Sequence, residues 1–207
     1  MTRTWFVLIT FAILCPPTAG WAQFKRGDVS AIVGYQWGGG LTTLEGRIEL
    51  EPSISYGAEI DIVARPEGEI VILYNRQDTD LKLVGGGAVA DSTLFGVAVN
   101  YFQVGGSGVA PLAGPAKPFV ALTLGMTWFD PKRSGVSSEW RFSGSLGGGV
   151  KVSPTPRIGI RAQARWWFNI LTANSQWWCG LPGGCYVSTA GTVVSQGEVS
   201  GGLMVNF

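Results

Sequence analysis

The sequence ends with Ser200-Gly201-Gly202-Leu203-Met204-Val205-Asn206-Phe207, a stretch in which two kinds of residue alternate. Counting back from the terminus, Phe207, Val205 and Leu203 share one face of an extended chain, and mostly polar or small residues share the other. A period of two residues indicates a β-strand whose faces lie in different environments. Most domains end in a polar, frayed tail. An apolar strand at the terminus therefore predicts that these last residues pair with another strand.

Seven further segments alternate in the same way, separated by Gly, Pro, Asp or Ser. They are Val29–Trp37, Ile48–Ile62, Glu69–Arg76, Leu94–Val104, Phe119–Phe129, Glu139–Val152 and Arg157–Ile170. Their even total of eight and their lengths suit tilted strands that cross a bilayer. We therefore predict an all-β fold, an eight-stranded antiparallel up-and-down transmembrane β-barrel over residues 23–207.

The apolar face of each strand is expected to contact lipid, and the polar face to line the lumen. In Ile48–Ile62 the even-numbered residues form the apolar face throughout, and in Leu94–Val104 this face is Phe95, Val97, Val99 and Tyr101. Glycines on the polar faces, Gly34, Gly57, Gly96, Gly125, Gly147, Gly149 and Gly159, are expected to leave room for long arginines.

Charged residues of both signs fall on the polar faces. They are Glu59, Asp61, Glu69 and Glu198 against Arg141, Lys151, Arg157, Arg161 and Arg165. An eight-stranded barrel is only wide enough for its own side chains, and unpaired buried charge is costly. These residues should therefore form ion pairs, with Arg161 or Arg165 as the partner of Glu198. Such a network can be a structural plug or a gate in a conduction path.

Aromatic residues on the apolar faces gather next to the long loops, as in an interfacial girdle. The predicted girdle is Tyr35, Trp37, Tyr74, Phe95, Trp128, Trp140, Trp166 and Phe168, with Tyr101 and Phe207 at the opposite rim. Loops after the first, third, fifth and seventh segments are mostly long, and those after the second and sixth are short turns. This pattern predicts external loops and two periplasmic termini.

The first 22 residues have the pattern of a cleaved signal peptide. Arg3 precedes an apolar run from Trp5 to Leu14 that is too short to span a membrane, and small residues allow cleavage after Ala22. Without Arg3, the 15 basic residues become 14, equal to the 14 acidic ones. This balance excludes a basic stripe for nucleic acid. In an oxidising compartment Cys179 and Cys185 predict a disulfide. No histidine accompanies them, so we predict no metal and no cofactor.

Two stretches resemble a known family. Ser200, Gly202, Val205 and Phe207 resemble the C-terminal signal recognised by the barrel-assembly machinery of outer-membrane proteins. The segment from Phe142 through Gly147-Gly148-Gly149-Val150-Lys151 to Arg165 resembles the last third of the small OmpA/opacity-like outer-membrane barrels. The resemblance implies an outer-membrane location and partners, namely lipid and the assembly machinery. The family serves adhesion, membrane integrity and small pores, so it implies a fold more than a function.

Four functions are compatible with these features. The first is a non-enzymatic barrel with a membrane-structural or surface-recognition role, in which Trp177–Tyr186 is a contact surface or the top of the girdle. The second is a narrow porin-like channel. The third, a lipid-modifying enzyme, lacks the histidine of Ser–His chemistry; an Asp–Asp or Ser–Lys arrangement stays open, although no motif indicates one. The fourth is a secreted soluble barrel that binds apolar ligands.

Overall fold

The computed structural model describes residues 26–43, 46–85, 91–111, 114–171, 175–180, 184–189 and 192–207. The predicted signal peptide lies outside these residues. All the regular structure in the described ranges is strand: β1 (Gly27–Gly38), β2 (Gly40–Thr43), β3 (Gly46–Leu50), β4 (Ser53–Arg65), β5 (Gly68–Gly85), β6 (Ser92–Val109), β7 (Ala116–Pro131), β8 (Glu139–Val152), β9 (Ile158–Leu171), β10 (Ser175–Gly180), β11 (Gly184–Thr189) and β12 (Thr192–Asn206). No helix in the described ranges is long and apolar enough to cross a membrane.

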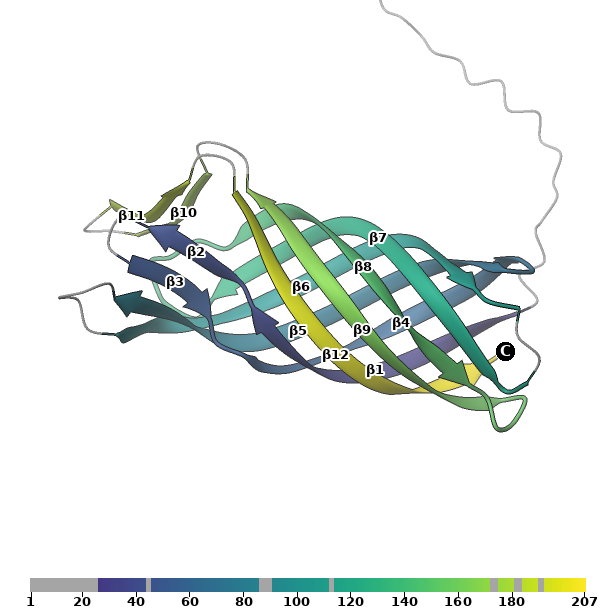
Figure 1. Ribbon diagram of the computed structural model, residues 1–207. Coiled ribbons are helices and arrows are strands. Elements are labelled where there is room, and N and C mark those ends of the chain that lie inside the picture. The colour runs from purple at the N-terminus through teal and green to yellow at the C-terminus, as the bar shows by residue number, and fades with distance from the viewer. Residues whose placement is uncertain are drawn as a thin grey trace, which may run out of the picture.

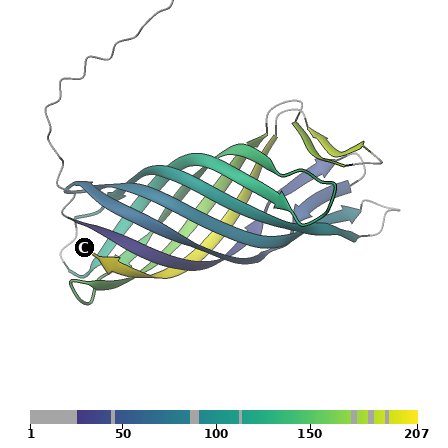
Figure 2. The same cartoon turned by 180° about the vertical axis from the view of Figure 1, so that it is seen from behind.

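Eight of these strands form a closed antiparallel barrel, as predicted. Each pairs with its neighbour in the order β1, β4, β5, β6, β7, β8, β9, β12, and β12 pairs back onto β1. Figures 1 and 2 show the continuous tilted wall from opposite sides. The hairpins β2–β3 and β10–β11 lie at one end of the barrel, which we call the loop end, and the C-terminus lies at the other, which we call the termini end (Figure 1).

The terminal stretch closes the barrel. Val205 is opposite Val29 on one side and opposite Ile158 on the other, so β12 pairs with two neighbours at once. The amide of Phe207 donates to the Gly27 carbonyl at 2.9 Å, and the Gly27 amide donates to the Phe207 carbonyl at 3.1 Å. The last residue thus satisfies backbone groups that would otherwise be left at an open sheet edge.

The outer wall is apolar across the strands. Large apolar side chains project outward with more than half of their surface exposed, including Val33, Ile54, Val120, Leu146 and Leu203. On the inner face the buried residues include many polar and charged ones. This arrangement is the reverse of a soluble barrel and matches the faces predicted for most strands.

The predicted segment Ile48–Ile62 is two strands, so its single apolar face was wrong. Ile48 and Leu50 in β3 are buried, whereas Ile54 in β4 is 64% exposed. The regular strand structure is interrupted at Glu51 and Pro52, because proline has no N–H group to donate to a neighbouring strand. The interruption reverses which parity faces outward, a change that sequence alternation alone does not reveal.

The faces of β6 were also assigned wrongly. Val97, Val99 and Tyr101 have no exposed surface and lie inside, whereas Phe102 and Val104 project outward at 42% and 57% exposure. Both parities of this strand are mostly apolar or small, with one amide on each (Asn100 and Gln103), so period-two reasoning could not choose between them. The polar side chain of Asn100 faces outward but is covered, and it binds the Tyr74 hydroxyl at 3.1 Å and the Trp128 carbonyl at 3.4 Å.

Several glycines allow neighbouring backbones to approach closely. A Cβ atom at Gly57 would lie 2.1 Å from the Tyr74 carbonyl oxygen, and one at Gly125 would lie 2.0 Å from the Phe102 carbonyl oxygen. Such approaches accompany strong bending of barrel strands. Gly147 does leave space for an arginine, because its Cβ would lie 3.3 Å from Cγ of Arg165. Gly96 was wrongly placed in the lumen and instead lies outside against Asp80 and Lys132.

Candidate functional site

The lumen nearest the termini end contains a lysine held by three carboxylates. Nζ of Lys151 lies 2.9 Å from Asp28, 2.9 Å from Asp61 and 2.8 Å from Glu69. Lys151 is near the end of β8, and its partners are on β1, β4 and β5 across the barrel. This ammonium therefore ties opposite walls together. Asp28 was not among the predicted charges, although it continues the polar parity of β1.

The ion-pair chain continues through two buried arginines. Arg161 donates to Asp61 at 2.8 Å and to Glu59 at 2.9 Å, and Arg165 donates to the other oxygen of Glu59 at 3.0 Å. All four side chains are at most 1% exposed. Cations and carboxylates alternate along this chain, so each buried charge has a neighbour of opposite sign, as buried charges require.

Aromatic rings pack against the same cations. The Arg161 guanidinium lies 4.9 Å from the centre of the Phe119 ring, and that of Arg165 lies 5.5 Å from the Trp167 ring. Such contacts stabilise a desolvated cation. Trp167 was not among the predicted lumen residues, although it continues the polar, inward parity of β9.

Glu198 does not bind the predicted arginines. It is opposite Arg165 in the β9–β12 register, but that guanidinium turns to Glu59. Oε2 of Glu198 instead accepts from Asn75 at 2.6 Å and from the Trp167 indole at 3.0 Å. The carboxyl is almost fully buried. The strand register places Glu198 opposite Arg165. The direction of the Arg165 side chain, however, makes Glu59 its ionic partner.

A layer of side-chain amides and one tyrosine lies on the loop-end side of the ion pairs. The Tyr101 hydroxyl donates to Gln196 at 2.6 Å, and the Gln196 amide donates to Gln77 at 2.9 Å. The Tyr101 ring stacks on Trp167 with centres 4.1 Å apart. These residues come from β5, β6, β9 and β12, so they reach across the barrel from several walls and fill its cross-section.

The loop-end part of the lumen is apolar. Its buried side chains belong to a cluster that continues from Tyr101 and Trp167: Ile48, Leu50, Leu81, Phe95, Val97, Val99, Phe129 and Val194. Two further members, Val71 and Leu73, lie beside the ion pairs, opposite Asp61 and Glu59 in the β4–β5 register. The lumen thus changes from ion pairs, through amides, to a hydrocarbon core. Phe95 was expected in the lipid-facing girdle and lies in this core, so that assignment was wrong.

Two predicted lumen charges lie apart from the ion-pair chain. Arg141 is near the start of β8 and pairs with Glu139 on the same strand. Arg157 is exposed in the turn between β8 and β9 at the termini end. There it lines a polar hollow of about 820 Å³ together with Lys117 and Lys151.

The remaining girdle residues lie on the outer wall. Tyr35, Trp37, Trp140 and Trp166 are exposed, and Tyr74, Trp128 and Phe168 are partly buried. Trp128 stacks on Trp140 with ring centres 5.9 Å apart, and Phe102 bridges Trp140 and Tyr74. Tyr101 is inside and so does not mark the opposite rim.

The two loop cysteines occupy paired backbone positions. Cys179 in β10 is directly opposite Cys185 in β11. The disulfide between them stays a prediction. No group of three or more cysteine or acidic residues in the described ranges could hold a metal ion.

Comparison with known proteins finds similarity in structure alone. No protein-family model matches, and no curated protein matches in sequence. The solved structure of Neisserial surface protein A matches with a TM-score of 0.55 and 17% identity, covering 87% of this chain and 97% of that one. This chain has the fold of a small outer-membrane barrel.

Two structures from Pseudomonas aeruginosa agree. The outer membrane protein OprG has a TM-score of 0.59 and 10% identity, covering 88% of this chain and 95% of that one. The N-terminal β-barrel domain of OprF has a TM-score of 0.51 and 12% identity, covering 88% and 97%. Sequence identities this low show that the fold is shared, and the function has to be inferred from the residues of this chain.

Proposed function

We propose that this protein is a non-enzymatic integral outer-membrane barrel whose filled lumen anchors a recognition surface at the loop end. The observation that supports the proposal is that the outer wall is apolar, whereas the lumen is closed by ion pairs. Leu203 and Val33 expose over 60% of their side chains. A wall of this kind is stable in hydrocarbon and would aggregate in water.

Membrane insertion would place the loop end outside the cell and both termini in the periplasm. Two turns, Arg65–Gly68 and the one before β9, lie at the same end as the C-terminus. The hairpins β2–β3 and β10–β11 lie at the opposite end (Figure 1). Small outer-membrane barrels place short turns in the periplasm and longer loops outside. The apolar wall also argues against the soluble ligand-binding barrel.

The β10–β11 hairpin is the proposed contact surface. A disulfide between Cys179 and Cys185 would join two strands that already pair and would restrict the hairpin that carries Trp177. Rigid aromatic residues lose little conformational freedom on binding, which favours them in recognition sites. The absence of histidine and the engagement of Glu59 and Asp61 in ion pairs support a role without catalysis.

The filled cross-section supports a closed barrel over the narrow channel. Tyr101 and Trp167 stack across the lumen, and the apolar cluster continues beyond them. A conducting path would have to displace both layers.

Membrane fractionation with gel electrophoresis of heated and unheated samples tests the proposal. We expect the protein in the outer-membrane fraction and a mobility change on heating, because a folded barrel resists detergent. Recovery in the soluble fraction without a change in mobility would overturn it.

A further inference from the structure

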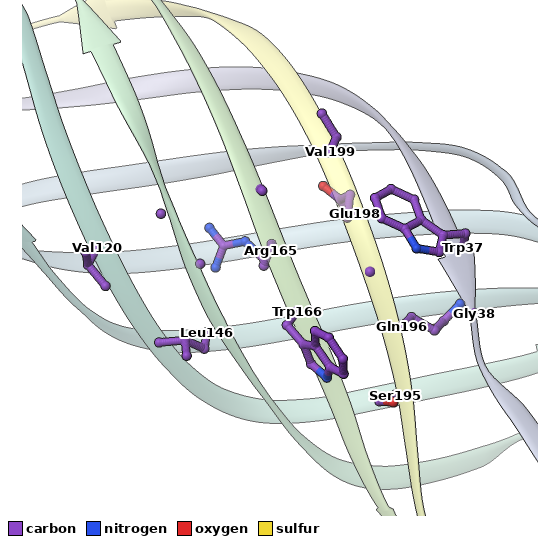
Figure 3. A pocket seen from close by; sticks show the side chains of 14 residues that line it. Trp37, Gly38, Val120, Leu146, Arg165, Trp166, Ser195, Gln196, Glu198 and Val199 are labelled. Carbon is purple, nitrogen blue, oxygen red and sulfur yellow. The ribbon is translucent and has the colours of Figure 1, made fainter.

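The outer wall contains a hollow of about 710 Å³ beside the closing strand β12. Its lining is mostly apolar and comes from β1, β7, β8, β9 and β12 (Figure 3). A hollow of this size is in the range of small-molecule sites. Large side chains project from the outer wall, so a hollow here needs a local cause.

Small residues form the floor. In the sheet register Gly148 on β8 is opposite Ala164 on β9, and Ala164 is opposite Val199 on β12. The adjacent row places Gly197 opposite Trp166. Arg165 and Glu198 also line the hollow, but their charged groups bind Glu59 and Asn75 in the lumen. The floor therefore exposes little polar surface to the outside.

Two tryptophans form the wall toward the loop end. Figure 3 shows Trp166 and Trp37 on opposite sides of β12, with Val120 and Leu146 on the far side of the hollow from Trp37. A Cβ atom at Gly197 would lie 2.8 Å from the Trp37 ring. The glycine therefore lets the Trp37 indole lie across the strand.

We propose that this groove binds one acyl chain of a membrane lipid, with the lipid's polar part beside Trp37, Trp166 and Ser195. The inference rests on the proposed membrane location. The groove is apolar at Val120, Leu146 and Val199, and Ser195 lines it beside Trp166 (Figure 3). Indole rings prefer the membrane boundary, where the N–H group meets polar groups and the ring meets hydrocarbon.

A single chain fits this surface better than a second copy of the protein. A second barrel would present its own convex wall, with side chains such as Val33 and Leu203 projecting from it, and would leave the hollow unfilled. Unfilled space loses dispersion contacts. A flexible acyl chain can follow the floor between the two indoles.

Photolabelling in vesicles tests the inference. The probe is phosphatidylethanolamine with a diazirine in one acyl chain, diluted into vesicles of phosphatidylethanolamine and phosphatidylglycerol that contain the full protein. We expect adducts to be several-fold enriched on peptides that contain Leu146, Trp166 or Val199 relative to other outward segments.

Ala164→Trp should fill the groove and reduce this enrichment to parity. Ala58→Trp, at an exposed outward position on β4, adds the same side chain away from the groove and should leave the enrichment unchanged. Uniform labelling of the wild type or equal effects of the two variants would overturn the inference. The heated and unheated gel on the same vesicles reports separately on membrane insertion, so the groove can fail while the proposed function stands.

Discussion

Glu59 is the carboxylate on which the ion-pair chain depends most, so Glu59→Gln should be strongly destabilising. It binds Arg161 at 2.9 Å and Arg165 at 3.0 Å, with no exposed surface on either side of the first contact. After substitution Arg161 keeps its ion pair with Asp61, whereas Arg165 keeps hydrogen bonds to Ser145 at 3.0 Å and Gln163 at 3.4 Å and the contact with the Trp167 ring. Arg165 would then be a buried cation without an ionic partner.

The expected loss in the free energy of unfolding is about 3–5 kcal/mol, the usual effect of removing one member of a buried pair. Urea unfolding in phospholipid vesicles, followed by tryptophan fluorescence, measures it. The matched control is Glu51→Gln, which removes a pair to Lys82 of 2.8 Å in which both side chains are 42% exposed. That control should lose about 0–1 kcal/mol.

Combining Glu59→Gln with Arg165→Met tests the physical cause. The second substitution removes the stranded cation, so the double variant should be more stable than the sum of the two single losses, by about 0.5–3 kcal/mol. Equal losses for Glu59→Gln and Glu51→Gln, together with simple additivity, would refute the claim that these charges are desolvated.

Three further predictions concern the lumen, the terminus and the loop. Tyr101→Ala with Trp167→Ala removes the stacked layer but leaves the apolar cluster, so we expect no conductance steps in planar bilayers from the wild type or from this variant; steps from the wild type would contradict a closed lumen. Deleting Phe207 removes two backbone hydrogen bonds to Gly27 and should lower the heat-modifiable fraction in cells, whereas unchanged assembly would contradict a role for the terminus. Thiol alkylation should label Cys179 and Cys185 only after reduction, and labelling of the native protein would exclude the disulfide.

Alternation predicted the class of fold because each barrel strand has one lipid-facing and one lumen-facing side. It succeeded best in β9, where the outward residues from Ile158 to Ile170 are apolar and the inward residues, apart from Trp167, are polar or small. It failed in β6, where the core at the loop end makes the inner face apolar as well. In such a strand the two faces carry similar residues, and only the neighbouring walls decide the direction.

The candidate site was less predictable than the fold. Sequence identified Glu59, Asp61, Lys151, Arg161 and Arg165 as inward charges, and the structure joins them in one chain. Their partners depend on side-chain direction across the lumen. No sequence spacing encodes that direction, and the pairing expected for Glu198 was wrong for this reason. The groove combines residues from five strands, so no local sequence motif could have predicted it.

The central claim is that the outer wall meets lipid and the inner face is closed to it. Nitroxide labels placed singly along β12 in a cysteine-free variant test this most directly, through collision with dissolved oxygen and with a water-soluble nickel chelate in vesicles. Labels at Val199, Leu203 and Val205 should collide with oxygen and be protected from nickel, whereas those at Ser200 and Met204 should be shielded from both. Nickel access at Leu203, or loss of the two-residue period, would contradict the account.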